Sequence, residues 1–338
     1  MIVDAIKDVE RGDSLDKQQM TEVVDAIMKG ECADKDIEAL LTGLYHKGET
    51  VEELAGAASA MRGHMTPVNS RRENLVDTCG TGGGMSGTFN ISTAAAIVAA
   101  AAGASVAKHG NRKSTSKTGS ADVLIELGVN IECSVKTVEK CIDQLGLCFC
   151  FAPLFHPSVK HVMNVRRKLP HPTLFNLLGP LCNPAGAPFQ LLGAGRGETR
   201  QLLAEALALL GIKRALVVHS KDGLGEISVA DQTDVSEING SSVVEGSLSP
   251  QDFGLEESDL ILIRVSNPKD SAEMIQRVLA GQSGAARDIV IANAAASLWV
   301  SGLTDSLVTG TERCAKAIDS GHATEMLNEL VELTNKDR

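Results

Sequence analysis

From Leu75 onward, short apolar runs alternate with segments of helical periodicity, and this alternation limits the folds available to the chain. The runs predicted to be strands are 75–77, 105–107, 147–151, 191–194, 215–218 and 260–263, with 289–291 as a further candidate. Helices are predicted between them, as at 92–102 and 199–210. Strands separated by helices favour an α/β fold with a largely parallel sheet flanked by helices. In such sheets, ligands bind beyond the carboxyl ends of the strands.

The chain before Leu75 has helical periodicity only. An apolar stripe from Met20 to Met28 predicts a helix that ends at Gly30, and Thr50 followed by two acids has the pattern of a helix N-cap. We therefore expect a small helical N-terminal domain beside a larger α/β domain. The expected boundaries are 1–72 for the helical domain, with about 165–187 packing back onto it, and 73–164 with 188–338 for the α/β domain.

Between Asp77 and Asp122 the sequence contains no Asp or Glu, although the chain has 43 acidic residues against 32 Lys and Arg. At that average density the window would hold about five or six acids. Glycines, hydroxyls and cations without carboxylates suit a bound polyphosphate, because nearby acids would repel it. Gly80 and Lys108 each follow a predicted strand, so both halves of the window are expected at one edge of the sheet.

The glycine run that begins at Gly80 is the first part of this window. Glycines let backbone amides approach an anion closely, and the helix that follows adds its dipole. A plain strand-to-helix turn is the alternative. The run is not a Walker A loop, because no Gly-Lys-Ser/Thr follows it. Residues 82–87 match G-x-G-x-x-G, but the acid that a dinucleotide fold needs about 20 residues later is missing.

Hydroxyl and cationic residues make up the rest of the window. Ser92 or Thr93 can cap the helix and can also hold phosphate oxygens or a hydrated Mg²⁺, as can the neighbouring Ser86 and Thr88. A cationic loop is predicted from Lys108, His109, Asn111, Arg112, Lys113 and Lys117, with a solvated loop as the alternative. The role of His109 is left open between a structural hydrogen bond and acid–base chemistry.

A second candidate segment follows the strand predicted at 215–218. Asp222 and Glu226 are candidates for metal-binding carboxylates at the same edge of the sheet, with an Asp-Gly turn as the alternative.

Composition excludes several classes of protein. An aromatic share of 3% and a pI near 5.3 argue against nucleic-acid binding. The N-terminus lacks the pattern of a signal peptide, and the apolar stretch 94–102 is too short to span a bilayer. We expect a cytoplasmic protein without a membrane partner. Its eight cysteines lack zinc-site spacing and are expected to be reduced thiols.

Taken in order, these motifs resemble the anthranilate phosphoribosyltransferases, and the resemblance covers nearly the whole chain. The segments that carry it are 77–83, 88–93, 108–112, 119–124, 151–153, 156–157, 165–167 and 175–184. The related class II nucleoside phosphorylases share the fold but usually differ after the glycine loop. The resemblance implies a homodimer that uses Mg²⁺ to transfer the 5-phosphoribosyl group of phosphoribosyl pyrophosphate to the amine of anthranilate, in tryptophan biosynthesis.

The resemblance also implies roles for individual residues. Phosphoribosyl pyrophosphate would be bound by Gly80, Gly83, Gly84, Thr88, Asn90, Ile91, Ser92, Thr93, Lys108, His109, Gly110, Asn111, Arg112, Lys113, Ser114, Thr115, Ser116 and Ser120. Anthranilate would be bound by Gly80, Asn111 and Arg166, of which Arg166 suits a carboxylate. Mg²⁺ would be held by Ser92 and Glu226. The residues implied in catalysis are Lys108, His109 and Arg166.

Two positions depart from the family pattern, which commonly has Asp where this chain has Gly84 and Gly225. The loss of two carboxylates implies that a second metal ion is not held in the common way. Two other functions remain open from the sequence. One is a pyrimidine-nucleoside phosphorylase that uses inorganic phosphate, and the other is a non-catalytic paralogue that binds phosphoribosyl or nucleic-acid ligands.

Overall fold

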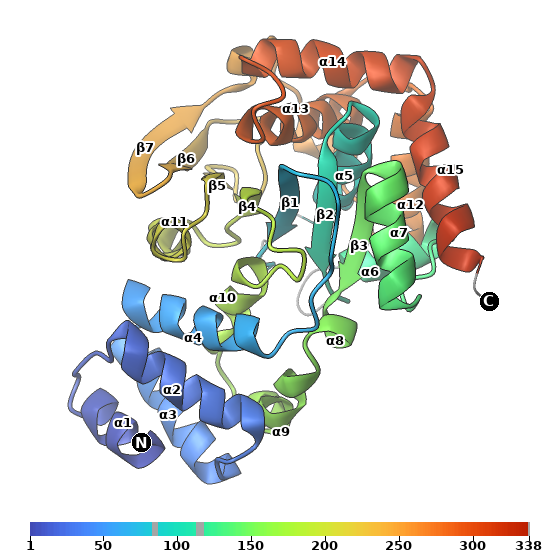
Figure 1. The fold of residues 1–338 in the computed structure, drawn as a ribbon. Helices are drawn as coiled ribbons and strands as arrows, with labels where there is room; N and C mark the ends of the chain where they lie inside the picture. The colour runs from blue at the N-terminus through green and yellow to red at the C-terminus, as the bar shows by residue number, and fades with distance from the viewer. Residues whose placement is uncertain (83–86, 113–117, 337–338) are drawn as a thin grey trace.

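The computed structural model describes residues 1–82, 87–112 and 118–336, which form a helical lobe attached to an α/β unit (Figure 1). The predicted fold class is confirmed. The lobe contains α1 (Ile2–Glu10), α2 (Lys17–Lys29), α3 (Asp34–Lys47) and α4 (Val51–Gly63). The helix α1 was not predicted from the sequence. Gly30 ends α2 in the left-handed conformation, and the Thr50 side chain caps α4, as both sequence patterns predicted.

Later segments of the chain return to this lobe. The helices α9 (Lys160–Lys168) and α10 (Phe175–Leu178) lie against it, with short 3₁₀ turns at η1 (Pro157–Val159) and η2 (Gly179–Leu181). Val162 and Val165 on α9 and Leu178 on α10 are fully buried in the same apolar core as α2, α3 and α4. This core continues through α11 (Arg200–Leu209) to one face of the sheet. One continuous apolar core therefore joins the helical lobe to the sheet.

The sheet has seven strands in the order β3-β2-β1-β4-β5-β6-β7. The first five are parallel, and β6 and β7 form an antiparallel hairpin at one edge. The strands are β1 (Leu75–Gly80), β2 (Ser105–Gly110), β3 (Leu147–Phe151), β4 (Phe189–Gly193), β5 (Arg214–Ser220), β6 (Thr233–Asn239) and β7 (Ser242–Leu248).

Two strand predictions were wrong, and the hairpin was not predicted. Residues 260–263 form a 3₁₀ turn, η5 (Leu260–Ile263), in which Ile261 and Leu262 are 63% and 65% exposed. The segment 289–291 lies inside α13 (Ala285–Val300), where alanines continue the buried face in both directions. Periodicity alone does not distinguish a short buried strand from part of a buried helix.

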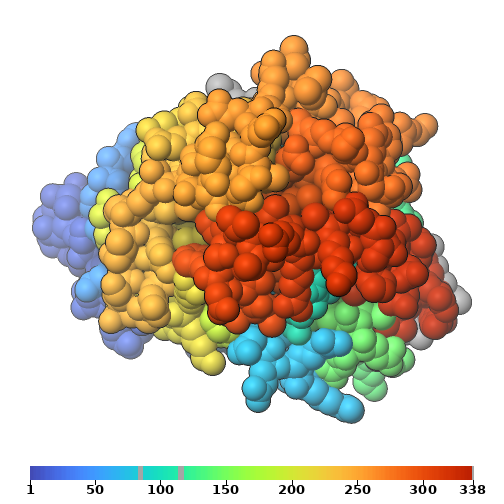
Figure 2. All heavy atoms as spheres, turned by 90° about the horizontal axis from the view of Figure 1, so that it is seen from above, coloured from blue at the N-terminus to red at the C-terminus, as the bar shows by residue number. Residues whose placement is uncertain are grey.

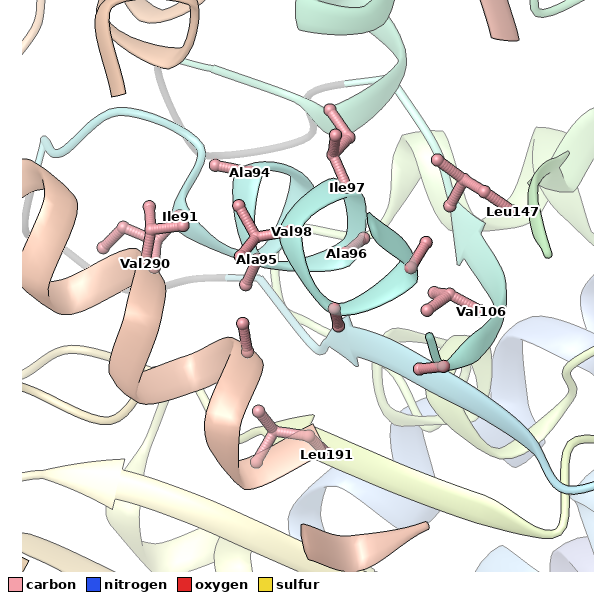
Figure 3. Packing of buried hydrophobic residues seen from close by; sticks show 14 of the residues in the cluster. Ile91, Ala94, Ala95, Ala96, Ile97, Val98, Val106, Leu147, Leu191 and Val290 are labelled. Atoms are coloured by element: carbon pink, nitrogen blue, oxygen red, sulfur yellow. The ribbon is translucent and has the colours of Figure 1, made fainter. Parts of the chain in front are cut away.

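The other face of the sheet is covered by α5 (Ile91–Ala101) and α13, which pack side by side (Figure 3). Alanines along α5 bring its backbone close to the strands, where Val106 and Leu191 meet it from β2 and β4. The remaining helices are α6 (Ser120–Glu126), α7 (Val135–Leu145), α8 (Ala152–Phe155), α12 (Pro268–Leu279), α14 (Leu307–Asp319) and α15 (His322–Asn335). Figure 2 shows α14 and α15 in red facing the viewer, while the N-terminal lobe emerges in blue at one edge.

Two further segments, η3 (Gly197–Thr199) and η4 (Pro250–Phe253), are short 3₁₀ turns. Within 1–82, 87–112 and 118–336, no helix is both long enough and apolar enough to cross a bilayer. All eight cysteines are free thiols, and Cys32 is the one that is not fully buried.

One buried carboxylate joins the segments of the helical lobe. Glu53 is 0% exposed and accepts hydrogen bonds from the backbone amides of Leu15 and Thr50, at 3.0 and 2.8 Å, and from Lys47 Nζ at 3.0 Å. We predict that Glu53→Ala lowers the free energy of unfolding by about 3 kcal/mol, because it leaves a buried ammonium unpaired. The neighbouring, exposed Glu52→Ala should change it by less than about 0.5 kcal/mol. Urea unfolding measures the free energy of unfolding of both variants. Equal effects of the two substitutions would contradict the role of Glu53 in holding the lobe together.

Candidate active site

The strands β2, β1, β4 and β5 are neighbours and parallel, so their carboxyl ends lie along the same edge of the sheet. The order of the strands reverses between β1 and β4. From β1 the chain runs to β2 and β3 on one side, and later to β4 and β5 on the other. Such a switch point opens a crevice at the ends of the two central strands. Here the Thr81 amide donates to the Gly193 carbonyl at 2.9 Å, and Thr81 Oγ1 accepts from the Gly195 amide at 2.9 Å. The loop after β1 is thereby tied to the loop after β4.

Glycines permit three backbones to meet at this point. A Cβ on Gly193 would lie 2.0 Å from the Gly225 carbonyl oxygen, and a Cβ on Gly80 would lie 3.0 Å from the Gly193 oxygen. No side chain larger than hydrogen fits at Gly193 without moving the loop after β5. By contrast, a Cβ on Gly225 would meet its nearest atom, the Ala194 carbonyl oxygen, at 3.4 Å, an ordinary contact distance. Glycine at position 225 is therefore not required by its surroundings.

Lys108 and His109 were predicted in a cationic loop, and this prediction was wrong. Both belong to β2 and are buried, with exposed fractions of 3% and 6%. Lys108 Nζ donates to the Thr78 carbonyl and, at 3.2 Å, to Ser92 Oγ. No carboxylate of the described chain lies within ion-pair distance of it. Burial lowers the pKa of Lys108, while the fields of Asp77 and Glu226 act in the opposite direction.

The helix α5 starts beside this ammonium and is capped by Asn90. Asn90 Oδ1 accepts from the Thr93 amide at 3.0 Å, and Nδ2 donates to the Thr118 carbonyl at 3.1 Å. Both polar atoms of the Asn90 side chain are thus hydrogen-bonded to backbone groups of the protein. Ile91 and Thr93 are buried, whereas Ser92 is half-buried and presents its hydroxyl to Lys108. Of the predicted hydroxyls that the structure describes, Ser92 is the one joined to the cation.

The segment after β2 carries the exposed end of the predicted site. Asn111 and Arg112 are exposed, and the Asn111 carbonyl accepts from Ser120 Oγ at 3.3 Å. Arg112 lies 5.7 Å above the Phe151 ring and pairs with Glu132 at 3.4 Å. Gly110 ends β2 in close contact with Ser120, so this turn is compact. The structure therefore leaves Asn111 exposed just after β2 and ties Arg112 to Glu132.

Glu226 belongs to the loop after β5, next to Gly225, which packs against Gly193 at the end of β4. It is half-buried, and its carboxylate has no hydrogen bond or ion pair within the described ranges. Burial raises the pKa of Glu226 to about 7, Lys108 opposes this shift, and Asp222 adds to it. Asp222 itself accepts from the Leu224 amide at 3.0 Å and from Ser228 Oγ at 2.5 Å. Asp222, the second metal candidate, is therefore engaged in shaping its own loop.

The oxygens near Lys108 suit a hard cation that brings its own ligands. Ser92 Oγ is hydrogen-bonded to Lys108 Nζ, and the field of the Glu226 carboxylate acts to raise the pKa of Lys108. Among the residues that the structure describes, no group of three or more His, Cys, Asp or Glu side chains could hold a metal. Mg²⁺ that is bound through a polyphosphate needs few protein ligands. Ser92 and Glu226 fit such an ion.

Arg166 lies on α9, in the segment that packs back onto the helical lobe. Its guanidinium lies 5.4 Å from the centre of the Phe175 ring, and Nη1 lies 3.8 Å from Met163 Sδ. It makes no ion pair with any described residue, and burial lowers its pKa. A half-buried, unpaired guanidinium is a site for an anionic group.

Two imidazoles lie where β2 meets the segment that returns to the helical lobe. The rings of His109 and His156 have centroids 5.0 Å apart, and His109 Nδ1 lies 3.0 Å from the Gly179 carbonyl oxygen, to which it donates. Burial is the main cause that lowers the pKa of His109 to about 3 and that of His156 to about 4. Both rings are neutral at pH 7, so His109 is not a general acid there.

Two buried amides that sequence reasoning missed hold the same segment. Gln190 Nε2 on β4 donates to the Pro180 carbonyl at 2.7 Å, and Asn183 Nδ2 donates to the Ala107 carbonyl at 2.8 Å. The signal for Gln190 was a lone amide within an apolar strand. Its partner lies on a different element, which the sequence does not indicate.

The structure thus brings together the residues predicted at the ends of β1, β2 and β5 and at the start of α5. Thr88 lies just before α5 and forms an isolated bridge with Arg264. Other predicted residues lie outside the described ranges, and nothing is concluded about their geometry. They are Gly83, Gly84, Ser86, Lys113, Ser114, Thr115, Ser116 and Lys117.

Comparison with known proteins identifies the family. Residues 72–324 match the α/β domain of a glycosyl transferase family, and residues 3–65 match the helical bundle domain of that family. An anthranilate phosphoribosyltransferase of Rhodopirellula baltica is 48% identical over 97% of this chain and 96% of its own length. The chain belongs to the anthranilate phosphoribosyltransferase family. A member from Thioalkalivibrio sulfidiphilus is also 48% identical, over 98% of each chain.

Solved structures of the family agree with the fold. The Thermus thermophilus anthranilate phosphoribosyltransferase has a TM-score of 0.92 at 39% identity, covering 98% of this chain and 99% of its own. The Saccharomyces cerevisiae enzyme in complex with PRPP and Mg has a TM-score of 0.88 at 28% identity, covering 98% and 97%. The same yeast enzyme has also been solved with 4-fluoroanthranilate.

The raised pKa of Glu226 predicts a pH dependence of stability in the metal-free protein. The folded state keeps the proton up to about pH 7, whereas the unfolded carboxyl loses it near its ordinary value of 4.5. The wild type should therefore lose stability relative to Glu226→Gln as pH rises from about 4.5 to 7, with no further loss above that range. Urea midpoints of both proteins in chelator test this. A difference that grows in favour of the wild type with rising pH would contradict it.

Proposed function

We propose that this protein transfers the 5-phosphoribosyl group of phosphoribosyl pyrophosphate to the amine of anthranilate and releases pyrophosphate. The observation that carries the proposal is the buried ammonium of Lys108 at the switch point of the sheet. It is held by neutral oxygens of Thr78 and Ser92, with no carboxylate of the described chain paired to it. A buried cation in this state is ready for an anionic ligand. The names of relatives at 48% identity support the same reaction.

The phosphate side of the proposed site lies at the ends of β1 and β2. Lys108 would face the pyrophosphate, with backbone amides after Gly80 and at the start of α5 around it. The further residues proposed to contact phosphoribosyl pyrophosphate are Gly83, Gly84, Thr88, Asn90, Ile91, Ser92, Thr93, His109, Gly110, Asn111, Arg112, Lys113, Ser114, Thr115, Ser116 and Ser120. For Asn90 and Ile91, backbone contacts are proposed, because their side chains are engaged or buried.

Ser92 and Glu226 are proposed to hold Mg²⁺ together with oxygens of the pyrophosphate. The yeast relative solved with PRPP and Mg supports the use of this ion. When bound, the ion would neutralise charge on the leaving pyrophosphate. Because Asp222 is engaged in its own loop and position 225 is glycine, we propose a single protein-held metal at this loop.

The acceptor side of the proposed site is the wall that carries Arg166. Its unpaired guanidinium would bind the anthranilate carboxylate, with Asn111 and Gly80 toward the sugar. In this proposal, Lys108 binds the sugar donor and Arg166 binds the acceptor. For His109 we propose positioning of this wall through its bond to the Gly179 carbonyl, because the neutral ring has no proton to donate as an acid.

The proposed reaction forms a bond from the anthranilate nitrogen to C1 of the ribose as the bond from C1 to the pyrophosphate oxygen breaks. The arylamine is neutral at pH 7, so its lone pair attacks without prior deprotonation. Its surplus proton leaves to pyrophosphate or water. Negative charge grows on the leaving group and meets the Lys108 ammonium and backbone amides. Orientation and electrostatic stabilisation then account for catalysis without a covalent intermediate.

We further propose a cytoplasmic homodimer that acts in tryptophan biosynthesis. Residues 1–72, with about 165–187, would form its helical domain. Residues 73–164 and 188–338 would form the α/β domain.

One assay separates this function from its alternatives. The protein is mixed with phosphoribosyl pyrophosphate, Mg²⁺ and anthranilate, and the loss of anthranilate fluorescence is followed. Mg²⁺-dependent loss is expected. A pyrimidine-nucleoside phosphorylase would instead cleave a pyrimidine nucleoside with phosphate, and a non-catalytic paralogue would bind ligand without turnover. An unchanged signal at every Mg²⁺ concentration would defeat the proposal.

Substitution of Arg166 tests the acceptor side. Arg166→Ala should raise the KM for anthranilate at least about tenfold, because it removes a charge-assisted contact to the carboxylate. The KM for phosphoribosyl pyrophosphate should stay within about twofold. Arg167→Ala on the exposed side of α9 is the matched control and should leave both constants unchanged. A change confined to the KM for phosphoribosyl pyrophosphate would show that the assignment is wrong.

A further inference from the structure

The loop that carries Glu226 is fixed on both sides of that residue, although the Glu226 carboxylate itself has no partner in the described chain. On the N-terminal side, Gly225 packs against Gly193 so closely that a Cβ on Gly193 would lie 2.0 Å from its oxygen. On the C-terminal side, the backbone of Ile227 is held by Asn293 of α13. Glu226 thus stands between two fixed points.

Asn293 binds Ile227 in the manner of a neighbouring β-strand. Its Oδ1 accepts from the Ile227 amide at 3.0 Å, and its Nδ2 donates to the Ile227 carbonyl at 2.9 Å. The second Nδ2 hydrogen reaches the Ile289 carbonyl at 2.8 Å. Asn293 is 2% exposed, and Ile227 is fully buried. Water therefore does not replace these bonds, and their loss leaves buried peptide groups unsatisfied.

This contact is distinct among the buried polar side chains of α13. Ser297, one turn later, is also fully buried, but its hydroxyl donates within the helix to the Asn293 carbonyl at 2.9 Å. Of these two, Asn293 alone reaches another element, and it reaches the residue beside Glu226. Ser297 is therefore a matched control on the same helix.

The rest of the loop is held by a separate set of bonds. Asp222 accepts from Leu224 and Ser228, and the Ser228 amide donates to Thr233 Oγ1 at 3.0 Å. These bonds close the loop but do not involve the backbone of Ile227. Loss of Asn293 should therefore release the residues next to Glu226 while the rest of the loop stays closed.

We propose that Asn293 is a positioning residue for the Glu226 carboxylate, and through it for the divalent cation that is bound with phosphoribosyl pyrophosphate. The inference rests on the metal site of the proposed function. A carboxylate that must meet a cation in a defined geometry loses affinity when its supporting bonds are removed, commonly by about 10- to 100-fold.

The test uses the full chain as wild type, Asn293→Leu, Ser297→Ala, Glu226→Gln and the double variant Asn293→Leu/Glu226→Gln. Two readouts are taken. The first is binding of Mn²⁺, which replaces Mg²⁺ as a paramagnetic probe, titrated in the presence of phosphoribosyl pyrophosphate without anthranilate. The second is the half-saturating Mg²⁺ concentration for loss of anthranilate fluorescence.

Asn293→Leu should weaken Mn²⁺ binding and raise the half-saturating Mg²⁺ by about tenfold or more, with the KM for anthranilate unchanged. Ser297→Ala should stay within about twofold of the wild type. In the Glu226→Gln background, Asn293→Leu should cause no further loss. If Asn293→Leu does not fold, Asn293→Asp keeps the acceptor for the Ile227 amide and removes the donors, and a smaller loss in the same direction is expected.

Unchanged Mn²⁺ affinity in the folded Asn293 variant would overturn the inference. So would an equal further loss in the Glu226→Gln background, since that result indicates a general structural role. A wild type that binds no Mn²⁺ with phosphoribosyl pyrophosphate would overturn the inference together with the metal site. A wild type that binds Mn²⁺ but does not consume anthranilate would refute the proposed reaction alone, and the Mn²⁺ titration would still decide the role of Asn293.

Discussion

The parallel pairing of β1 with β4 is the contact on which the candidate site depends. These strands are adjacent in the sheet but lie more than a hundred residues apart in the chain, because β2 and β3 are built between them on the other side of β1. The connections that leave their carboxyl ends run in opposite directions along the sheet, and ligands of α/β folds bind at such a switch point. The Thr81 amide and the Gly193 carbonyl join the two loops, and glycine at 193 lets the loop after β5 close over the same point. The residues proposed to bind phosphate and those proposed to bind the metal therefore lie around the carboxyl ends of this pair of strands and their neighbours.

Two cations of the candidate site lack an acidic partner within the described residues, which is unusual for an acidic protein. The ammonium of Lys108 is buried and is held by neutral oxygens, while Arg166 on α9 lies over the Phe175 ring without an acid. Burying unpaired charges costs stability in the free protein, and a ligand that supplies the opposite charge recovers that cost on binding. A pyrophosphate beside Lys108 and a carboxylate beside Arg166 would supply the missing opposite charges. The buried amide of Gln190 on β4 hydrogen-bonds the Pro180 carbonyl, and that of Asn293 on α13 hydrogen-bonds Ile227 in the loop after β5.

The sequence indicated much of this arrangement, and its errors have physical causes. The five parallel strands were predicted because each is a short apolar run buried on both faces. The hairpin β6–β7 was not predicted, because its edge strand β7 is largely exposed and polar and so lacks an apolar run. Residues 260–263 are as apolar as a core strand, but two of them point to solvent in a 3₁₀ turn. Lys108 was predicted in a cationic loop after a strand, because charged residues are uncommon inside strands, whereas the structure extends β2 through it and buries it. Asn293 could not be assigned, because its partner is set by tertiary packing alone.

The central claim is that the buried ammonium of Lys108 receives the pyrophosphate of the sugar donor. Calorimetric titration of phosphoribosyl pyrophosphate in Mg²⁺, with wild type and Lys108→Met, tests it most directly. Methionine has a similar length and an uncharged end, so the apolar packing of the side chain is kept. The account predicts one binding site per chain in the wild type and a loss of affinity of at least about 100-fold in Lys108→Met, with thermal stability retained or increased. Equal affinity in the two folded proteins would contradict it.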